Sequence, residues 1–254
     1  DISGVRVFML KMNQTAASPL HDKDVRNAVA HIINYDSMAK IIGNGSTPGA
    51  APFPPSANLG YDTIANKATT DVAKADQILT QAGYAKNANG VYAKDGKELS
   101  LTLAVWGKDT SMYEEIQQEL KQAGINVTLK KLQSPDEVDT LGTDGFDLVE
   151  RNVITMSTND PYWFLSLFYK SGAKANVGAY SNPQVDALID QLSVTFDQNE
   201  RSTIAKQAQQ ILVDDVADIY LLYPSATVVS TNKVKNVPAH PIDYYLLTKD
   251  STIE

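Results

Sequence analysis

The pattern of hydrophobic and polar positions predicts a strand and a helix before the first long loop. Residues 5–12 (VRVFMLKM) mix β-branched and other apolar side chains over the length of a strand. From residue 25 onwards, apolar residues recur every three to four positions behind Asp22 or Asp24 as a cap. This spacing predicts a helix that extends or resumes as far as residue 42. Residues 43–70 are rich in Gly, Pro, Ser and Asn and predict a long loop.

The middle of the chain alternates between helical and strand patterns. The expected elements, in order, are a helix at 71–82, a hairpin with an Asp-Gly turn at 91–99, a strand at 99–106, a helix at 111–123, a strand at 125–132, a short helix at 135–141 and a strand at 146–152. This order favours an α/β fold with a mixed sheet flanked by helices. Within it, 99–106 and 146–152 are expected to run parallel.

Three further helices are predicted from their N-terminal signals. Two begin with proline at the first turn, one after Asn159 or Asp160 as cap and one after Asn182. A third begins at Asp197, with Glu200 as its capping-box partner. The strand patterns that follow are 219–223 and 226–230.

Composition and charge exclude several classes of protein. Of 254 residues, 43% are apolar and 20% charged, which is typical of an ordered globular chain with one large domain or at most two. The 22 basic and 30 acidic residues give 22 − 30 = −8, and no basic patch is larger than Lys130-Lys131. We therefore expect no nucleic-acid partner. No apolar run reaches the roughly eighteen residues of a membrane span.

The residues that carry chemistry are scattered. The chain has no cysteine, and its three histidines lack the spacing of a local metal site. Neither a nucleophile elbow nor a phosphate-binding loop occurs. Asp214, Asp215 and Asp218 lack EF-hand spacing and predict a solvated acidic helix end. We therefore expect no catalytic site, no cofactor and no metal bound directly by the chain.

The segment 151–164 (RNVITMSTNDPYWF) has a residue pattern unlike the rest of the chain: a strand end is followed by polar residues and then by two aromatic residues that open a helix. Ligands in open α/β sheets tend to bind at strand carboxyl ends and helix N-termini. A purely structural interpretation is also open. In that interpretation Asn159 or Asp160 caps the helix, Pro161 is its first residue, and the aromatic residues belong to the core.

Several phrases, taken in order, resemble one family: the extracellular solute-binding proteins of peptide and nickel ABC importers (solute-binding protein family 5). Residues 19–36 (PLHDKDVRNAVAHIINYD) resemble its P-x-x-D-x-x-V-R-x-A-x-x-x-A-I-D-R passage. Residues 75–84 (ADQILTQAGY) resemble A-x-x-L-L-x-x-A-G-Y, 146–148 resemble the strand before the ligand loop, and 180–186 (YSNPQVD) resemble Y-x-N-P-x-x-D. The likeness extends from residue 5 to about residue 247.

The resemblance implies the C-terminal half of a protein about double this length. The fold would then be the C-terminal lobe of a periplasmic-binding-protein type II fold. Residues 22–217 would form the ligand-closing lobe, 1–21 a strand entering from the first lobe, and 218–254 returning strands and a tail toward that lobe. The opening DISGVRVFMLKMN lacks the pattern of a secretory leader. Either the protein is not exported, or the absent half carries the signal peptide and, as in many members, a lipid-anchored cysteine.

The resemblance also points to ligand-facing residues. In peptide-binding members, a cleft strand runs from an arginine to an acidic-Pro pair nine residues on, and Arg151 stands nine before Asp160. Such an arginine can fork onto a carboxylate. The family's aspartate for a peptide ammonium group would fall at Ser157, and its aromatic residue at Ile154, so a free amino terminus loses its charged partner. The ligand-binding candidates are Arg151, Asn152, Ser157, Thr158, Asn159, Asp160, Trp163 and Asn176.

The function that the resemblance implies is the substrate-binding component of an ABC importer, which captures an oligopeptide-like solute between two lobes and delivers it to a membrane permease. One alternative is a nickel or metal-chelate receptor, with Arg151 pairing with the chelator's carboxylates and Trp163 packing on it. Another is a peptide-binding chaperone or signalling receptor, and an enzyme is a further class. The expected setting is the extracellular face of the membrane or the periplasm, with a lipid anchor in the full-length protein, which acts as a monomer.

Overall fold

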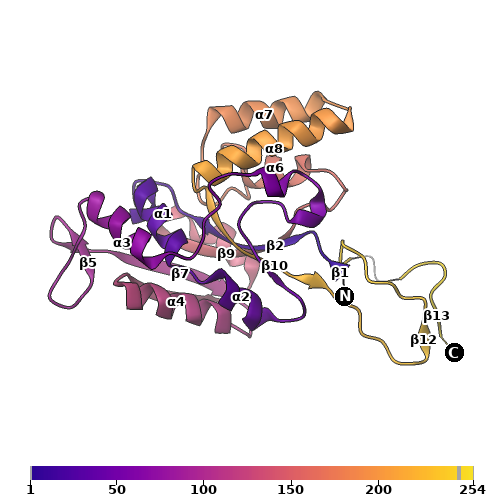
Figure 1. The fold of residues 1–254 in the computed structure, drawn as a ribbon, viewed down its shortest axis with the longest axis horizontal. Coiled ribbons are helices and arrows are strands. Elements are labelled where there is room, and N and C mark those ends of the chain that lie inside the picture. Colours follow the sequence, from indigo (N-terminus) through magenta and orange to yellow (C-terminus); the bar gives the residue numbers. More distant parts are fainter. Residues whose placement is uncertain (1, 245–246, 254) are drawn as a thin grey trace.

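The fold is organised around a six-stranded mixed sheet (Figure 1). The computed structural model describes residues 2–244 and 247–253. β7 runs parallel to its neighbours β8 and β9, whereas β2 runs antiparallel to β9 and β10. From one edge to the other, the strands are β3 (Thr47–Pro48), β10 (Asp218–Tyr223), β2 (Arg6–Met12), β9 (Leu148–Ile154), β7 (Ser100–Trp106) and β8 (Asn126–Leu132).

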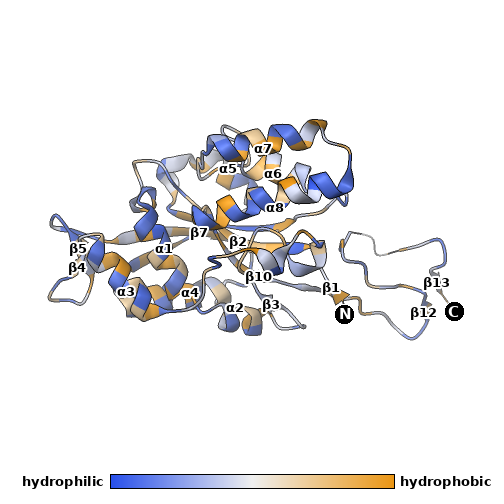
Figure 2. Cartoon of the chain, turned by 45° about the horizontal axis from the view of Figure 1, so that its top comes forward, coloured by the Kyte–Doolittle hydropathy of each residue, from blue (hydrophilic) through white to orange (hydrophobic). Residues whose placement is uncertain are grey.

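Helices cover both faces of the sheet, because successive strand residues point to opposite faces. Leu10 and Met12 of β2 join one hydrophobic core, and Val7 and Met9 join another. The first core contains α1 (Lys23–Ile32), α2 (Tyr35–Ile42), α3 (Val72–Gln81) and α4 (Ser111–Ala123). The second contains α6 (Tyr162–Phe168), α7 (Pro183–Val194) and α8 (Gln198–Asp214), which lie together above the sheet in Figure 1. Individual helices carry both hydrophobic and hydrophilic residues (Figure 2), as amphipathic packing requires.

The predicted α/β architecture is confirmed, including the parallel pairing of β7 with β9. The N-terminal signals at three helices are also confirmed. The side chain of Asp71 accepts a hydrogen bond from the Lys74 N–H at the start of α3. The side chains of Asn182 and Asp197 likewise accept hydrogen bonds from backbone N–H groups at the starts of α7 and α8. These caps were predictable because they depend only on neighbouring residues.

Three details of the sequence-based prediction are wrong. α6 begins one residue later than expected, so Pro161 is its N-cap and Asn159 lies before it in the left-handed region, with a φ of 56°. The strand expected at 226–230 is limited to β11 (Ser225–Ala226), which pairs with β1 (Ile2–Ser3). Asp218 does not belong to a solvated helix end but is a buried residue of β10.

The segment 43–70 is mostly loop, as predicted, but part of it is buried. Ala51, Phe53, Leu59 and Ile64 pack into the second core. The smaller elements are the three-stranded sheet β4 (Ala85–Lys86), β5 (Tyr92–Lys94) and β6 (Lys97–Glu98), α5 (Val138–Leu141), the pair β12 (Val234–Lys235) and β13 (Thr252–Ile253), and 3-10 turns at Pro19–His21, Pro55–Ala57, Tyr61–Thr63, Pro135–Glu137 and Thr143–Gly145.

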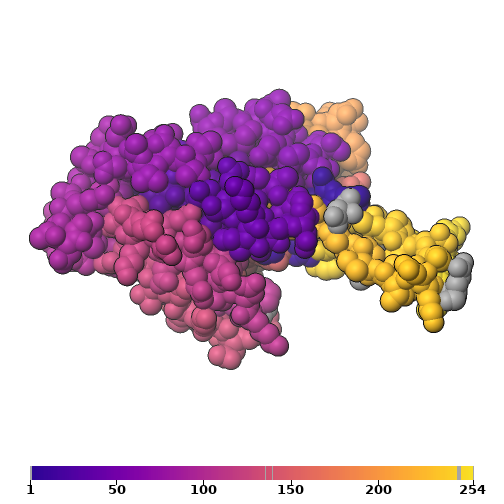
Figure 3. Space-filling view, turned by 60° about the horizontal axis from the view of Figure 1, so that its bottom comes forward, coloured from indigo at the N-terminus to yellow at the C-terminus, as the bar shows by residue number. Residues whose placement is uncertain are grey.

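The two ends of the chain contribute to the sheet and then diverge. β2 and β10, from the segments 1–21 and 218–254, lie side by side in the sheet, so both belong to the same layer as β7, β8 and β9. The assignment of these segments to a first lobe stays a prediction. After β11 the chain extends away from the body as an arm that carries β12 and β13 (Figure 3).

Candidate functional site

A cavity of about 410 Å³ lies at the carboxyl end of β7. The ladder between β7 and β9 pairs Leu103 with Leu148 and Ala104 with Val149. β7 ends soon after it, at Trp106, whereas β9 continues further. The carboxyl ends of parallel strands are common ligand sites in α/β sheets. The lining residues are Trp106, Asp136, Arg151, Asn152, Val153, Ile154, Ser157, Trp163, Phe168, Ala175 and Tyr244.

A larger concavity of about 860 Å³ follows α4 and β8 at the edge of the sheet. Its walls carry Glu114, Gln117, Lys121 and other polar residues, without an aromatic side chain or a buried cation. Surface of this kind is ordinary for an exposed edge strand and helix. The cavity beyond β7 is therefore the stronger candidate, although it is smaller.

Arg151 reaches this cavity because of its position in β9. It lies opposite Met9 of β2 and therefore points to the face of the sheet that carries α6. The residue is half-buried in the wall. Its charge also lowers the pKa of the neighbouring Lys11, although burial has the larger effect on that lysine. A guanidinium group in this position can pair with a carboxylate of a bound molecule.

Asn152 connects the cavity to the C-terminal arm through Arg6. Arg6 Nη1 donates to Asn152 Oδ1 at 2.8 Å, while its Nε and Nη2 donate to the Asp243 carboxylate at 2.9 Å each. The next residue, Tyr244, lines the cavity. This contact was missed from the sequence, because nothing local connects residue 6 with residues 152 and 243.

Two tryptophans, the only two in the chain, line the cavity. Trp163 is 39% exposed, and its ring meets Phe168 edge-on with centroids 6.2 Å apart. Trp106 was not predicted as a site residue. Its position at the end of a predicted parallel strand is the signal that could have indicated it.

Four of the eight predicted site residues, Arg151, Asn152, Ser157 and Trp163, line this cavity, and the others lie outside its lining. Thr158 and Asn159 are exposed. The Asp160 carboxylate accepts from Arg201 Nε at 2.8 Å and from the Tyr162 N–H at 2.8 Å, which ties the start of α6 to α8. That ion pair gives Asp160 a structural role.

The buried side chain of Asn176 also has structural contacts. Its Nδ2 donates to the carbonyls of Tyr180 at 2.7 Å and Lys170 at 3.1 Å, and so closes the turn between α6 and α7. Ala175, directly before it, lines the cavity. Asn176 therefore holds the turn that places Ala175 in the cavity wall, without lining the cavity itself.

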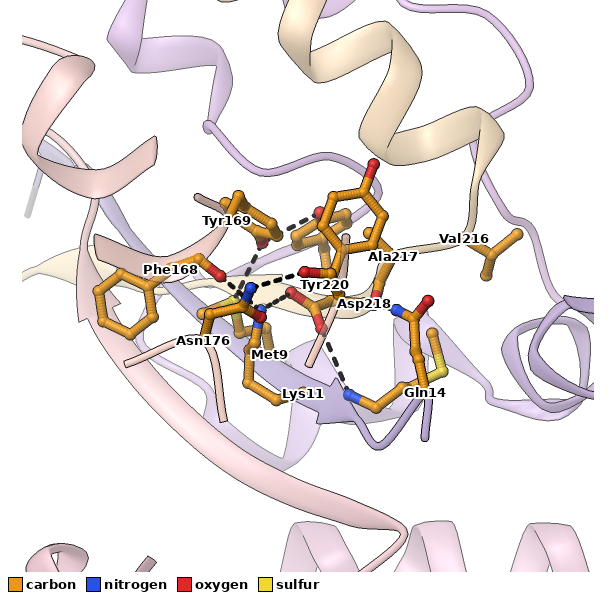
Figure 4. A network of polar contacts seen from close by, with 12 residues as sticks. Met9, Lys11, Gln14, Phe168, Tyr169, Asn176, Val216, Ala217, Asp218 and Tyr220 are labelled. Carbon is orange, nitrogen blue, oxygen red and sulfur yellow. Dashed lines mark hydrogen bonds and ion pairs between the residues drawn. The ribbon is translucent and has the colours of Figure 1, made fainter. Parts of the chain in front are cut away.

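A buried ion pair supports the same wall (Figure 4). Lys11 Nζ lies 2.7 Å from Asp218 Oδ2, donates to the Phe168 carbonyl at 3.0 Å and sits 4.2 Å from the centre of the Tyr169 ring. Burial lowers the pKa of Lys11 and raises the pKa of Asp218, and the attraction between the two charges opposes both shifts. The pair fixes the end of α6, where Phe168 lines the cavity.

Neither a metal site nor a membrane span is found in the part of the chain that the structure describes. No group of three or more His, Cys, Asp or Glu side chains among residues 2–244 and 247–253 is placed to hold a metal ion. No helix in these residues is both long and apolar enough to cross a bilayer.

The chain belongs to the bacterial extracellular solute-binding proteins of family 5, whose middle-region model matches residues 1–176. It is 29% identical over 259 residues to the nickel-binding protein NikA of Staphylococcus aureus, covering 99% of this chain and 49% of that protein. It is also 29% identical over 249 residues to the probable D,D-dipeptide-binding periplasmic protein DdpA of Escherichia coli, covering 95% and 45%.

The crystal structure of NikA from Staphylococcus aureus in complex with Ni(L-His)2 has the same fold, with a TM-score of 0.77 and 26% identity over 99% of this chain and 52% of that one. The resemblance found in the sequence is thereby confirmed. The chain spans about half the length of the relatives it matches. These relatives are named as binding proteins rather than enzymes.

Proposed function

We propose that the chain forms part of the solute-binding component of an ABC importer and binds an oligopeptide-like solute for delivery to a membrane permease. The observation that carries the proposal is Arg151, half-buried in a cavity that Trp106 and Trp163 also line. The volume of about 410 Å³ falls within the usual range for small-molecule sites, roughly 300–1,000 Å³. One fixed cation among aromatic walls suits a solute that carries a carboxylate.

The main chain of β9 supports a peptide-like solute. The Thr155 N–H donates to the Val5 carbonyl at 2.8 Å, which sets the phase of the ladder between β2 and β9. In an antiparallel ladder the main-chain groups point alternately toward and away from the partner strand, so those of Asn152 and Ile154 point away from β2. The Asn152 carbonyl already accepts a long hydrogen bond from Arg6 Nη1 at 3.4 Å, so Ile154 offers the main-chain groups for a peptide. β7 has ended at this level, so an extended peptide can lie along this edge.

A metal chelate is the second candidate, because the Staphylococcus aureus relative was crystallised with Ni(L-His)2. In this chain, the chelator's carboxylates would pair with Arg151 and its organic part would pack on Trp163. No direct bond between protein and metal is needed in that arrangement.

The wider setting is part of the same proposal. The protein acts as a monomer at the extracellular face of the membrane or in the periplasm, with a lipid anchor in the full-length protein. Residues 22–217 form the closing lobe, and a second wall from the rest of the protein completes the site. A peptide-binding chaperone or signalling receptor would use the same cavity, but would not require the permease for uptake of its ligand.

Titration calorimetry of the full-length protein, which supplies the second wall, tests the site with trialanine, trialanine amide and the nickel–histidine complex. We expect trialanine to bind and its amide to bind about tenfold more weakly, because the amide lacks the carboxylate that meets Arg151. In Arg151→Gln this preference should disappear. Lys97→Gln removes an exposed charge on the β5–β6 hairpin and should leave it unchanged.

Two outcomes decide against the peptide assignment. If trialanine and its amide bind the unmodified full-length protein equally, no carboxylate is recognised and the role of Arg151 is wrong. If only the nickel–histidine complex binds, and Arg151→Gln weakens it, the metal-chelate candidate replaces the peptide.

A further inference from the structure

A second, smaller cavity of about 150 Å³ lies on the other face of β9. It adjoins the first cavity, because Trp106 and Asn152 line both. Its other walls include the apolar side chains of Phe8, Ile42 and Met112. The two compartments therefore meet around the end of β7.

Glu150 gives the smaller cavity a negative charge. It lies one residue before Arg151 on β9, so the two side chains leave the strand on opposite faces and present opposite charges to the two compartments. Glu150 is only 5% exposed, and its carboxylate accepts the Trp106 N–H at 2.6 Å and a hydrogen bond from the Tyr113 hydroxyl. Burial raises the pKa of Glu150, while these two donors and the charge of Arg151 oppose the rise.

The chemistry of this compartment is specific. Apolar walls suit a hydrocarbon chain, and a buried carboxylate favours a cation over a neutral group or an anion. Asp109, an exposed residue at the same cavity, adds a second negative charge. A volume of about 150 Å³ corresponds to several water molecules at about 30 Å³ each, enough for one short arm of a solute.

We propose that this cavity is a subsite for an ammonium-ended apolar arm of the same solute whose carboxylate meets Arg151. The inference rests on the proposed function and makes it narrower, since the preferred solute is then zwitterionic. In the family resemblance, the aspartate for a ligand's ammonium group falls at Ser157, which has no charge. Glu150 would supply the negative charge instead.

Three probes test recognition of the ammonium group separately from recognition of the carboxylate. ε-Aminocaproate carries a carboxylate, an apolar chain and an ammonium group. Caproate lacks the ammonium group, and adipate has a second carboxylate in place of it. We expect ε-aminocaproate to bind about tenfold more tightly than caproate, and adipate to bind more weakly than caproate. Quenching of Trp106 and Trp163, which line the cavities, provides the measurement.

Two variants test the subsite. Glu150→Gln keeps an acceptor for the backbone N–H of Trp106 and should make ε-aminocaproate and caproate bind equally. Ile41→Lys, at a lining position that is 41% exposed, places a competing ammonium group at the cavity and should weaken ε-aminocaproate alone. Asp62→Asn removes an exposed acid from the 43–70 loop and should change neither affinity. Urea unfolding of each variant confirms that it is folded.

The outcomes distinguish this subsite from the carboxylate site. An unmodified full-length protein that binds ε-aminocaproate no better than caproate overturns the subsite, as does a tenfold preference that survives in Glu150→Gln. The proposed function is judged separately, by whether Arg151→Gln weakens caproate. If none of the three probes binds, the subsite is wrong, whereas the carboxylate site is still decided by the peptide titrations.

Discussion

Replacing Lys11 by methionine is expected to lower the free energy of unfolding by about 3–5 kcal/mol. The change leaves the Asp218 carboxylate, 4% exposed, without its cation at 2.7 Å. It also removes the donor that the Phe168 carbonyl receives from Lys11 Nζ. Since a buried charge without a partner is among the most costly defects in a protein core, this single substitution should rank with the most destabilising in the chain.

Urea denaturation of four variants checks the interpretation: Lys11→Met, Asp218→Leu, the combination of the two, and Lys170→Met. The double variant Lys11→Met/Asp218→Leu removes both charges and should recover much of the loss. Lys170→Met breaks the surface ion pair with Asp190 and should cost no more than about 1 kcal/mol. A double variant as unstable as the sum of its two single variants would show no coupling between Lys11 and Asp218, and the isolated-charge interpretation would be wrong.

Replacing Gly178 by alanine is expected to destabilise the protein by about 3 kcal/mol. A Cβ at this position would lie 2.2 Å from the Met12 carbonyl oxygen and 3.0 Å from its carbon. Both atoms belong to the backbone of β2, and the Gly178 carbonyl is itself held by the Gln14 N–H at 2.8 Å. The clash cannot be relieved by a change of rotamer, so the backbone must move.

The neighbouring residue provides a control of opposite sign. Ala179 has a φ of 56°, in the left-handed region that disfavours a Cβ. Ala179→Gly should therefore stabilise the protein, by about 0.5–1 kcal/mol after the greater flexibility of glycine in the unfolded chain is counted. Thermal unfolding should show the melting temperature falling in Gly178→Ala and rising in Ala179→Gly. If both changes destabilised the protein, the segment would be sensitive to any substitution and the close contact with β2 would not be the cause.

The parts of the fold that depend on local pattern could be predicted from the sequence. Period-two and period-3.6 spacing indicated the main strands and helices, and Asp71, Asn182 and Asp197 indicated helix starts that the structure confirms. The start of α6 was misplaced by one residue: the Asp160 carboxylate accepts the Tyr162 N–H, as a cap does, but Pro161 is the N-cap, and the same carboxylate pairs with Arg201 of α8. That pairing is a tertiary contact, and no local rule contains it.

The candidate site was predictable to the extent that it lies on one continuous segment. The residue pattern of this segment and the family resemblance indicated four residues that line the cavity: Arg151, Asn152, Ser157 and Trp163. Trp106 and Tyr244 come from distant parts of the chain. The partners Lys11 and Asp218 are 207 residues apart, and each alone looks like an ordinary polar residue.

The central position of β2 also determines the order in which the protein can fold. β2 precedes both of its neighbours, which come much later in the chain: Thr155, just after β9, bonds to a residue 150 positions earlier, and β10 lies further still. Contacts of such long range require closure of large loops before they contribute stability, and they slow folding. The sheet therefore closes only after β10 has been synthesised, 207 residues after β2 as counted from Lys11 to Asp218. Until then the apolar side chains of β2 lack the neighbours that cover them in the native sheet.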